Sequence, residues 1–282
     1  MATGTDPALP SPLAPTLERF FETKSACDID GTMSYFSPAL ASYIDATLGW
    51  DLDGYDKLAG VFAHYMPNWG PTARSYATQI LSNEVSALVR MVDTPELFGG
   101  ELRILAAIDL ADGKIVRWVD YWDSSAYSSD LYARFRTPAD AFPTDLKDGE
   151  VPSRAAPGLV DTCTTLHRAL AAGDAVGVHD LLHTDVVLAD MALRTQVIGR
   201  IETVSYLDRV LGHLPYGRSS SLRHVVGGEG GGGFEWTAGD GIVGITEIVC
   251  AGGLITGINS VYDSRRLEPD RKSALTAAAF PP

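Results

Sequence analysis

Hydrophobic and polar residues alternate along four consecutive stretches in the first half of the chain. The stretches cover residues 75–81, 84–92, 101–110 and 114–123. Alternation places successive side chains on opposite faces of a strand, and turn residues separate the stretches. The pattern therefore predicts an antiparallel meander of about four strands, which closes on the segment KIVRWVDYWD at residues 114–123.

Helical spacing dominates the segment before these strands. Leu17, Phe20 and Phe21 form one apolar stripe, which predicts a first helix capped by Thr16 and broken at residues 28–31. Another stripe runs from residue 58 to residue 65 and predicts a helix that opens after Asp53-Gly54 and ends at Pro67. The remaining elements expected here are a short helix over residues 32–36 and a short strand over residues 43–45.

The same order of elements begins again at Pro157. Helices are expected over residues 159–170, 176–182 and 201–214, and strands over residues 186–190, 222–226, 234–237, 242–250 and 254–263. The two copies also match by position, since Asp190 follows Asp45 by 145 residues and Ile258 follows Trp118 by 140. We therefore predict an α+β fold of two tandem cone-shaped domains, each with helices packed on a curved antiparallel sheet.

The boundaries of the two domains follow from proline content and from the start of the repeat. We expect a disordered leader over residues 1–15, a first domain over 16–137, a linker over 138–156, a second domain over 157–268 and a tail over 269–282. A glycine run at residues 227–233 is expected to be a flexible hairpin connection, placed to act as a lid beside the second pocket.

Composition narrows the classes of partner. The chain has 282 residues and a net charge of −14, so nucleic acid and anionic membranes are not expected partners. Three widely spaced cysteines, without a signal peptide or a membrane-spanning run, indicate a cytoplasmic protein. His179 and His183 lie four residues apart, but no third ligand is evident, so no metal site is expected.

One carboxylate, Asp120, lies in the middle of the bulky apolar strand that closes the first domain. Residues two apart share a face, so Asp120 is expected to lie with Trp118 and Trp122. If that face lines a cavity, burial raises the pKa of the carboxyl toward the range useful for a base. The alternative is a structural acid paired with Arg103 or Arg117 on the sheet.

These residues resemble a known family. A Gly-Lys-Ile turn followed by Trp-x-Asp-Tyr-aromatic-Asp, in the context of residues 17–130, is similar to the nuclear transport factor 2-like superfamily with its cystatin-like cone fold. The limonene-1,2-epoxide hydrolase and SnoaL-like polyketide cyclase branches are the most similar. Two such domains in tandem also resemble the epoxide-opening cyclases of polyether biosynthesis, which use an Asp and a Glu in each pocket.

The resemblance assigns roles to several residues. Asp120 falls on the base that activates water, and Tyr43 and Asp45 fall on residues that hold this water, with Asp45 in place of an asparagine. The proton donor of the epoxide hydrolases is an Arg-x-Asp on an earlier strand. The nearest match is Arg90 with Asp93, which departs from that spacing. Asp45 alternatively caps a turn at the end of its strand.

Further residues are expected to bind substrate in the two pockets. They are Tyr65, Trp118 and Trp122 in the first domain and Asp190, Glu235 and Trp236 in the second. Ser260 occupies the second-domain position equivalent to Asp120. The second domain is therefore either a scaffold or binding domain, or it uses a different acid pair built from Asp190 with Glu235 or Glu247.

Together these observations predict a cofactor-independent acid/base enzyme of natural-product (for instance antibiotic) biosynthesis. The expected reaction is epoxide opening or cyclisation of a hydrophobic polyketide or terpenoid intermediate in the first-domain pocket. Two alternatives remain open: an aldol cyclase or isomerase, and a non-catalytic small-molecule binding protein. We expect the two domains to pair within one chain, which would act as a monomer or a dimer.

Overall fold

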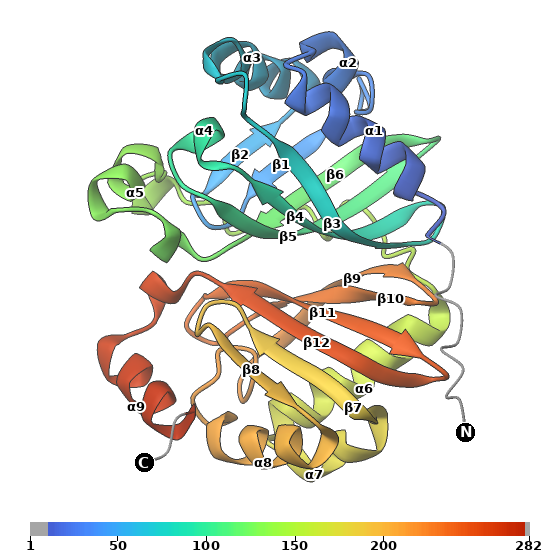
Figure 1. Cartoon of the computed structure of the whole chain (residues 1–282), viewed down its shortest axis with the longest axis vertical. Coiled ribbons are helices and arrows are strands. Elements are labelled where there is room, and N and C mark those ends of the chain that lie inside the picture. The colour runs from blue at the N-terminus through green and yellow to red at the C-terminus, as the bar shows by residue number, and fades with distance from the viewer. Residues whose placement is uncertain (1–10, 280–282) are drawn as a thin grey trace.

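The chain forms two six-stranded sheets, one in each half of the sequence, and each sheet is covered by helices on one face (Figure 1). The computed structural model describes residues 11–279. Residues 1–10 of the leader expected over 1–15 lie outside this range, and Ala14 and Pro15 already belong to the first helix. Strand order is β2-β1-β6-β5-β4-β3 in the first sheet and β8-β7-β12-β11-β10-β9 in the second. The identical order confirms the predicted α+β fold of two tandem domains.

The first domain contains the elements that the apolar patterns predict, together with an unpredicted strand over residues 50–53 and a short helix over residues 95–98. Its strands are β1 (Ser42–Asp45), β2 (Trp50–Asp53), β3 (Ser75–Ser82), β4 (Ser86–Asp93), β5 (Leu102–Ala111) and β6 (Lys114–Tyr121). Its helices are α1 (Ala14–Ser25), α2 (Ile29–Met33), α3 (Tyr55–Tyr65), α4 (Pro95–Phe98) and α5 (Ser129–Phe135), with 3₁₀ turns η1 (Met66–Asn68), η2 (Ser124–Ala126) and η3 (Ala139–Ala141).

The second domain repeats this order. Its strands are β7 (Leu182–Asp190), β8 (Thr195–Ile198), β9 (Ser221–Gly228), β10 (Gly231–Thr237), β11 (Val243–Ala251) and β12 (Leu254–Tyr262). Its helices are α6 (Pro157–Ala172), α7 (Ala175–Val178), α8 (Arg200–Val210) and α9 (Pro269–Ala279), with 3₁₀ turns η4 (His179–Leu181) and η5 (Ser264–Arg266). Across residues 11–279, none of the helices combines the length and apolar character that crossing a membrane requires.

Three local features differ in detail from the sequence-based expectation. The first helix ends before residues 28–31 as expected, but the next one, α2, begins at Ile29 and not at Thr32, because Asp28 caps it through the amide of Gly31. The expected tail contains α9, whose Leu275 is fully buried in the second domain. The sheets are mixed and not purely antiparallel, because β1 runs parallel to β6 and β7 runs parallel to β12.

The two sheets pack against each other through their faces that carry no helices. Val119 and Leu88 from the first sheet form one buried cluster with Val226, Ile245 and Val261 from the second. Strict alternation along β6 therefore sends Val119 into this interface and Trp118 into the helix-covered core of the first domain.

Buried charges cross this interface. Arg117 has no exposed surface and donates hydrogen bonds at 2.8 Å to both carboxylate oxygens of Glu235 in the second domain. Asp109 lies 3.3 Å from the same guanidinium, and Tyr121 donates to Glu235 at 2.5 Å. Glu235 is therefore satisfied within the domain interface, and the expectation that it lines a second pocket is wrong.

The glycine run is a close-packing device and not a lid. Its residues lie in the β9–β10 hairpin, and Gly228 approaches the first domain so closely that a Cβ there would lie 2.2 Å from the backbone oxygen of Ser82. Only a residue without a side chain fits at that distance, so the glycine allows the two domains to touch along their backbones.

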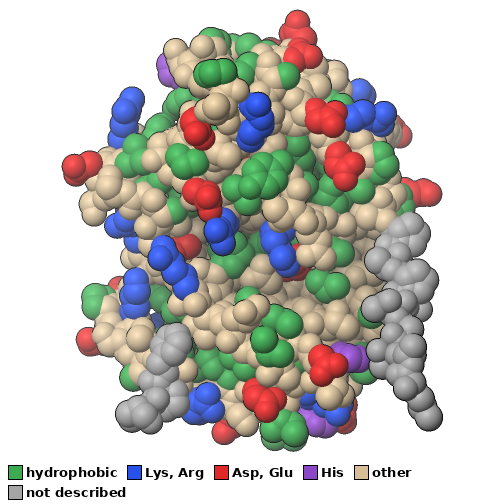
Figure 2. Space-filling view, viewed as in Figure 1, with side chains coloured by type: hydrophobic (Ala, Val, Ile, Leu, Met, Phe, Trp, Pro, Cys, Tyr) green, Lys and Arg blue, Asp and Glu red, His purple; other side chains and the backbone are tan. Residues whose placement is uncertain are grey.

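The exposed surface between the domains carries charged side chains of both signs. The face drawn in Figure 2 carries acidic and basic side chains intermixed, and it is hollowed where the domains meet. This groove has a volume of about 890 Å³, and its lining includes Arg90, Arg103 and Asn259.

Candidate functional site

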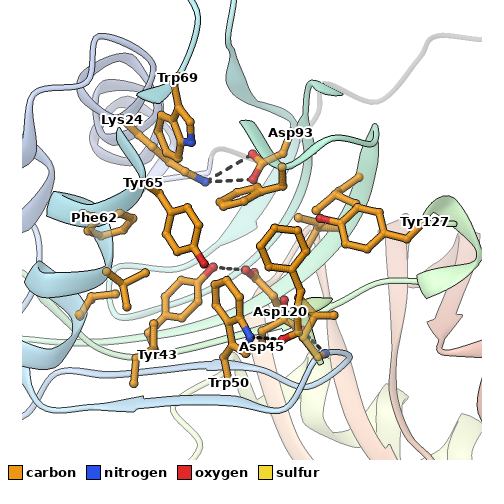
Figure 3. Close-up of a pocket in the computed structure, with 18 residues that line it drawn as sticks. Lys24, Tyr43, Asp45, Trp50, Phe62, Tyr65, Trp69, Asp93, Asp120 and Tyr127 are labelled. Carbon is orange, nitrogen blue, oxygen red and sulfur yellow. Dashed lines mark hydrogen bonds and ion pairs between the residues drawn. The ribbon is translucent and has the colours of Figure 1, made fainter. Parts of the chain in front are cut away.

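A small cavity lies between the first sheet and the helices that cover it (Figure 3). Its volume is about 50 Å³, room for a few water molecules. Most of its wall is aromatic or aliphatic, and its polar or ionisable side chains come from Lys24, Tyr43, Asp45, Tyr65, Asp93, Asp120 and Tyr127. An apolar wall with a few convergent polar groups is typical of a small-molecule site.

Asp120 is the central acid of this cavity. Its side chain shares the helix-covered face with Trp118, as the alternation predicts, and it is 2% exposed. Tyr43 donates a hydrogen bond to Oδ2, and the indole of Trp118 donates to Oδ1 at 2.6 Å. Burial raises the pKa of Asp120 to about 7, and the charge of Asp45 adds to this, against the two hydrogen bonds and Lys24, which lower it.

Tyr43 is held as a hydrogen-bond donor to this acid. Its ring stacks on Trp118 with centroids 6.0 Å apart, which fixes the direction of its hydroxyl. Burial, and then the negative charge of Asp120, raise the pKa of Tyr43 well above its usual value. The hydroxyl therefore keeps its proton at every pH at which the fold is expected to be stable.

Asp45 is a second acid on the neighbouring strand. It is the register partner of Asp120 in the parallel pair of β1 and β6. Oδ1 accepts hydrogen bonds from the amides of Thr47 and Leu48 at 2.9 and 2.7 Å, and Oδ2 accepts one from the indole of Trp122 at 3.0 Å. Burial raises the pKa of Asp45 to about 6 in spite of these bonds. Asp45 thus caps the turn after β1 and also lines the cavity.

An ion pair forms another wall of the cavity, and Lys24 was missed as a site residue. The ammonium of Lys24 on α1 lies 3.2 and 3.3 Å from the two oxygens of Asp93 at the end of β4, and Ser75 also donates to Asp93. Lys24 is only 5% exposed. Figure 3 shows this pair on a different side of the cavity from Tyr43 and Asp120.

The expected tryptophans support the acids without lining the cavity themselves. Trp118 and Trp122 are both buried, and each gives its indole N–H to one of the two aspartates. Tyr65 on α3 does line the cavity and stacks on Trp50, with ring centroids 5.8 Å apart. The two indoles, which lie outside the cavity, therefore orient the aspartates, while other aromatic rings form the surface that a ligand would contact.

Arg90 is not part of this cavity, contrary to expectation. Its position on β4 turns its side chain to the opposite face of the sheet, where its guanidinium binds Glu247 of the second domain. Asp93, three residues later, faces the cavity and forms its ion pair with Lys24 on α1. The structural alternative for Asp120 does not hold either, since Arg117 binds Glu235 and Arg103 binds Glu101.

The second domain places its acid differently. Asp190 is 1% exposed and accepts hydrogen bonds from the hydroxyls of Tyr216 and Tyr262 at 3.1 and 3.3 Å. Burial raises the pKa of Asp190 to about 6. Trp236 is fully buried and packs on the same two tyrosine rings. In this domain aromatic side chains surround the acid, where the first domain has its cavity.

Comparison with known proteins gives structural likenesses only. The chain is similar to an LEH-like epoxide hydrolase from Mycobacterium tuberculosis, with 17% identity and a TM-score of 0.35, over 43% of this chain and 89% of that one. It is also similar to a putative ketosteroid isomerase from Kribbella flavida (18% identity, TM-score 0.34, 46% of this chain and 92% of that one). A steroid delta-isomerase from Pseudomonas aeruginosa gives 17% identity and a TM-score of 0.36, over 45% of this chain and 93% of that one.

No family model matches the chain, and no curated protein matches it. Function is therefore inferred from the cavity itself. Among residues 11–279, no group of three or more His, Cys, Asp or Glu side chains is placed to hold a metal ion.

Proposed function

We propose that the first-domain cavity is the active site of a cofactor-independent enzyme in which Asp120 transfers a proton on a hydrophobic small molecule. The observation that carries the proposal is the state of Asp120: a buried acid at an aromatic cavity, with a pKa of about 7. A general base works best when its pKa lies near the working pH, and buried acids with such pKa values cluster at functional sites.

The reaction that we favour is the opening or cyclisation of an epoxide in a polyketide or terpenoid intermediate. Ionised Asp120 takes a proton from a water molecule or a substrate hydroxyl, whose oxygen bonds to an epoxide carbon while the carbon–oxygen bond of the ring breaks. Lys24 supplies a positive charge and a proton for the released oxygen. The ion pair with Asp93 holds the Lys24 side chain in place, and Tyr43 orients Asp120.

The same two groups also favour a second candidate, which is isomerisation or aldol closure of a carbonyl compound. There Asp120 removes a proton from carbon, and Lys24 stabilises the negative oxygen of the enolate. The supporting observation is again that a base and a buried cation line one apolar cavity from different elements.

The test uses three proteins: the wild type, Asp120→Asn and Ser260→Ala. Ser260 occupies the position equivalent to Asp120 in the second domain, and its hydroxyl bonds to that of Thr246, so its variant is the matched control. Lipophilic epoxides are incubated in H₂¹⁸O and conjugated ketones in D₂O, and label incorporation is followed by mass spectrometry. We expect the wild type to turn over compounds of one panel. Asp120→Asn should lose about 10²–10⁴-fold of this turnover, and Ser260→Ala should keep the wild-type rate.

The outcome also separates the reaction classes. Incorporation of ¹⁸O, or ring closure of a hydroxy-epoxide, identifies epoxide opening, whereas deuterium on carbon identifies isomerisation. Equal turnover in wild type and Asp120→Asn would overturn the proposal. Binding of panel compounds with no label incorporation in the wild type would instead support a binding protein.

A further inference from the structure

A loop of the second domain reaches the first domain beside the cavity. Asp263, directly after β12, accepts hydrogen bonds from the hydroxyls of Ser124 at 2.6 Å and of Tyr132 at 3.2 Å. Arg265 donates to the backbone oxygens of Ser124 at 3.2 Å and of Tyr127 at 2.5 Å. Its guanidinium also lies 5.2 Å above the ring of Tyr132. Figure 1 shows this loop next to the end of α5.

The segment that this loop holds forms one wall of the cavity. Tyr127 and Phe135, at the two ends of the segment that contains α5, both line it. The indole of Trp50 donates to the backbone oxygen of Phe135 at 2.7 Å, so the segment is also tied to β2 on the first-domain side. Residues 127–135 therefore cover the cavity between two anchors, one in each domain.

This segment has little stability of its own. α5 has seven residues and none of them is buried. Isolated helices of that length are unstable in water, so its position depends on the partly buried side chains that it packs against the first-domain core and on the contacts at its ends. The other walls come from strands of the sheet and from α1, α3 and α4, and each of these three helices buries at least one residue.

For a polyketide or terpenoid to bind in this cavity, one of its walls has to move. Ligand pockets in proteins usually hold about 300–1,000 Å³, whereas this cavity holds about 50 Å³. A polyketide or terpenoid does not fit in that volume. The wall with the fewest buried residues is the one that opens at the lowest free energy.

We propose that Asp263 and Arg265 of the second domain are positioning residues that hold residues 127–135 closed over the first-domain cavity. This rests on the proposed function to the extent that the cavity is the substrate site. The second domain then controls entry to the active site of the first, without any chemistry of its own.

Two variants weaken this contact and one leaves it intact. Arg265→Ala removes the bonds to Ser124 and Tyr127, and Tyr132→Phe removes only the hydroxyl that binds Asp263. Arg266→Ala is the matched control, because Arg266 belongs to the same loop but stacks on Phe142, 5.0 Å away, which does not line the cavity.

Hydrogen–deuterium exchange of the full chain tests the proposal without any substrate. We expect the amides of residues 129–135 to exchange about tenfold or more faster in Arg265→Ala, because hydrogen bonds from a charged group are lost, and by a smaller factor in Tyr132→Phe. Exchange in β6 should not change in either variant, and Arg266→Ala should match the wild type throughout. Unchanged exchange of α5 in Arg265→Ala, or an equal increase in Arg266→Ala, would overturn the proposal.

Turnover assays then connect the segment to the chemistry. In Arg265→Ala we expect a changed KM with an unchanged pH dependence, since the contacts of Asp120 are intact. If no substrate in either panel is turned over but α5 exchange rises as expected, the proposed function fails and the positioning role stands. A shift of the pH profile in Arg265→Ala would show that the loop acts on Asp120 and not on the covering segment.

Discussion

Asp45 and Asp120 are register partners on the adjacent parallel strands β1 and β6, and both carboxyl groups line the same cavity. Burial raises the pKa of each, to about 6 for Asp45 and about 7 for Asp120. The negative charge of Asp45 adds to burial in raising the pKa of Asp120. Two acids whose environments separate their pKa values are the usual basis for an acid/base site.

Asp45→Asn should move the pH dependence of turnover to lower pH. In the wild type, activity should rise with pH through about 7, because only ionised Asp120 accepts a proton. Removing the negative charge of Asp45 lowers the pKa of Asp120, so the base is ionised at a lower pH. The measurement is kcat/KM against pH, and an unchanged or upward-shifted profile would contradict the electrostatic coupling.

Tyr43→Phe should move the same profile in the opposite direction. The hydroxyl of Tyr43 stabilises ionised Asp120 through its hydrogen bond, so its loss raises the pKa of that acid. The maximal rate should also fall, by about 10-fold or more, since one oxygen of the base is no longer oriented. The two profiles measured together serve as controls for each other, and shifts of the same sign would contradict one of the two assignments.

Lys24→Met should reduce both stability and turnover, and the two effects should separate. The variant leaves Asp93 buried with only Ser75 as a partner, which costs about 3–5 kcal/mol in the free energy of unfolding. Lys24→Met combined with Asp93→Asn removes the unpaired charge and should recover much of that loss, as measured by urea unfolding. Turnover should stay low in the double variant. Recovered turnover would mean that Lys24 has only a structural role.

Gly228→Ala should destabilise the chain by about 1–3 kcal/mol, because its Cβ would overlap the backbone oxygen of Ser82 in the other domain. Gly60→Ala is the control, since no atom lies within 4 Å of a Cβ at that exposed position on α3. That change should be neutral or stabilise by up to about 1 kcal/mol. Equal denaturation midpoints for the two variants would show that the domains do not depend on this close approach.

The face of β6 that carries Asp120 could be predicted from the sequence, because a period of two leaves only two choices and the tryptophans mark the one that lies under the helices, although both faces are buried. The buried position of Lys24 could also have been predicted from the sequence. It continues the stripe of Leu17, Phe20 and Phe21 at helical spacing, so a charged residue on the buried face of α1 was visible. A buried lysine requires an acid partner, but the choice of Asp93, 69 residues away, depends on the tertiary fold.

Arg90 and Glu235 were misplaced for a different reason. Both lie on sheet faces that alternate correctly, but the sequence does not tell which face meets helices and which meets the other domain. Arg90 shares its face with Leu88, which packs in the cluster between the sheets. Charged residues that point to such an interface look the same in a sequence as charged residues that point into a pocket.

The most direct test of the account is the pH profile of turnover for the wild type, Ser260→Ala and Asp120→Asn on the substrate panel. If Asp120 is the base, the wild type and Ser260→Ala rise together through a pKa of about 7, and Asp120→Asn loses about 10²–10⁴-fold and has no such rise. If Asp120→Asn retains wild-type turnover with the same profile, the assignment of the active site to this cavity is wrong.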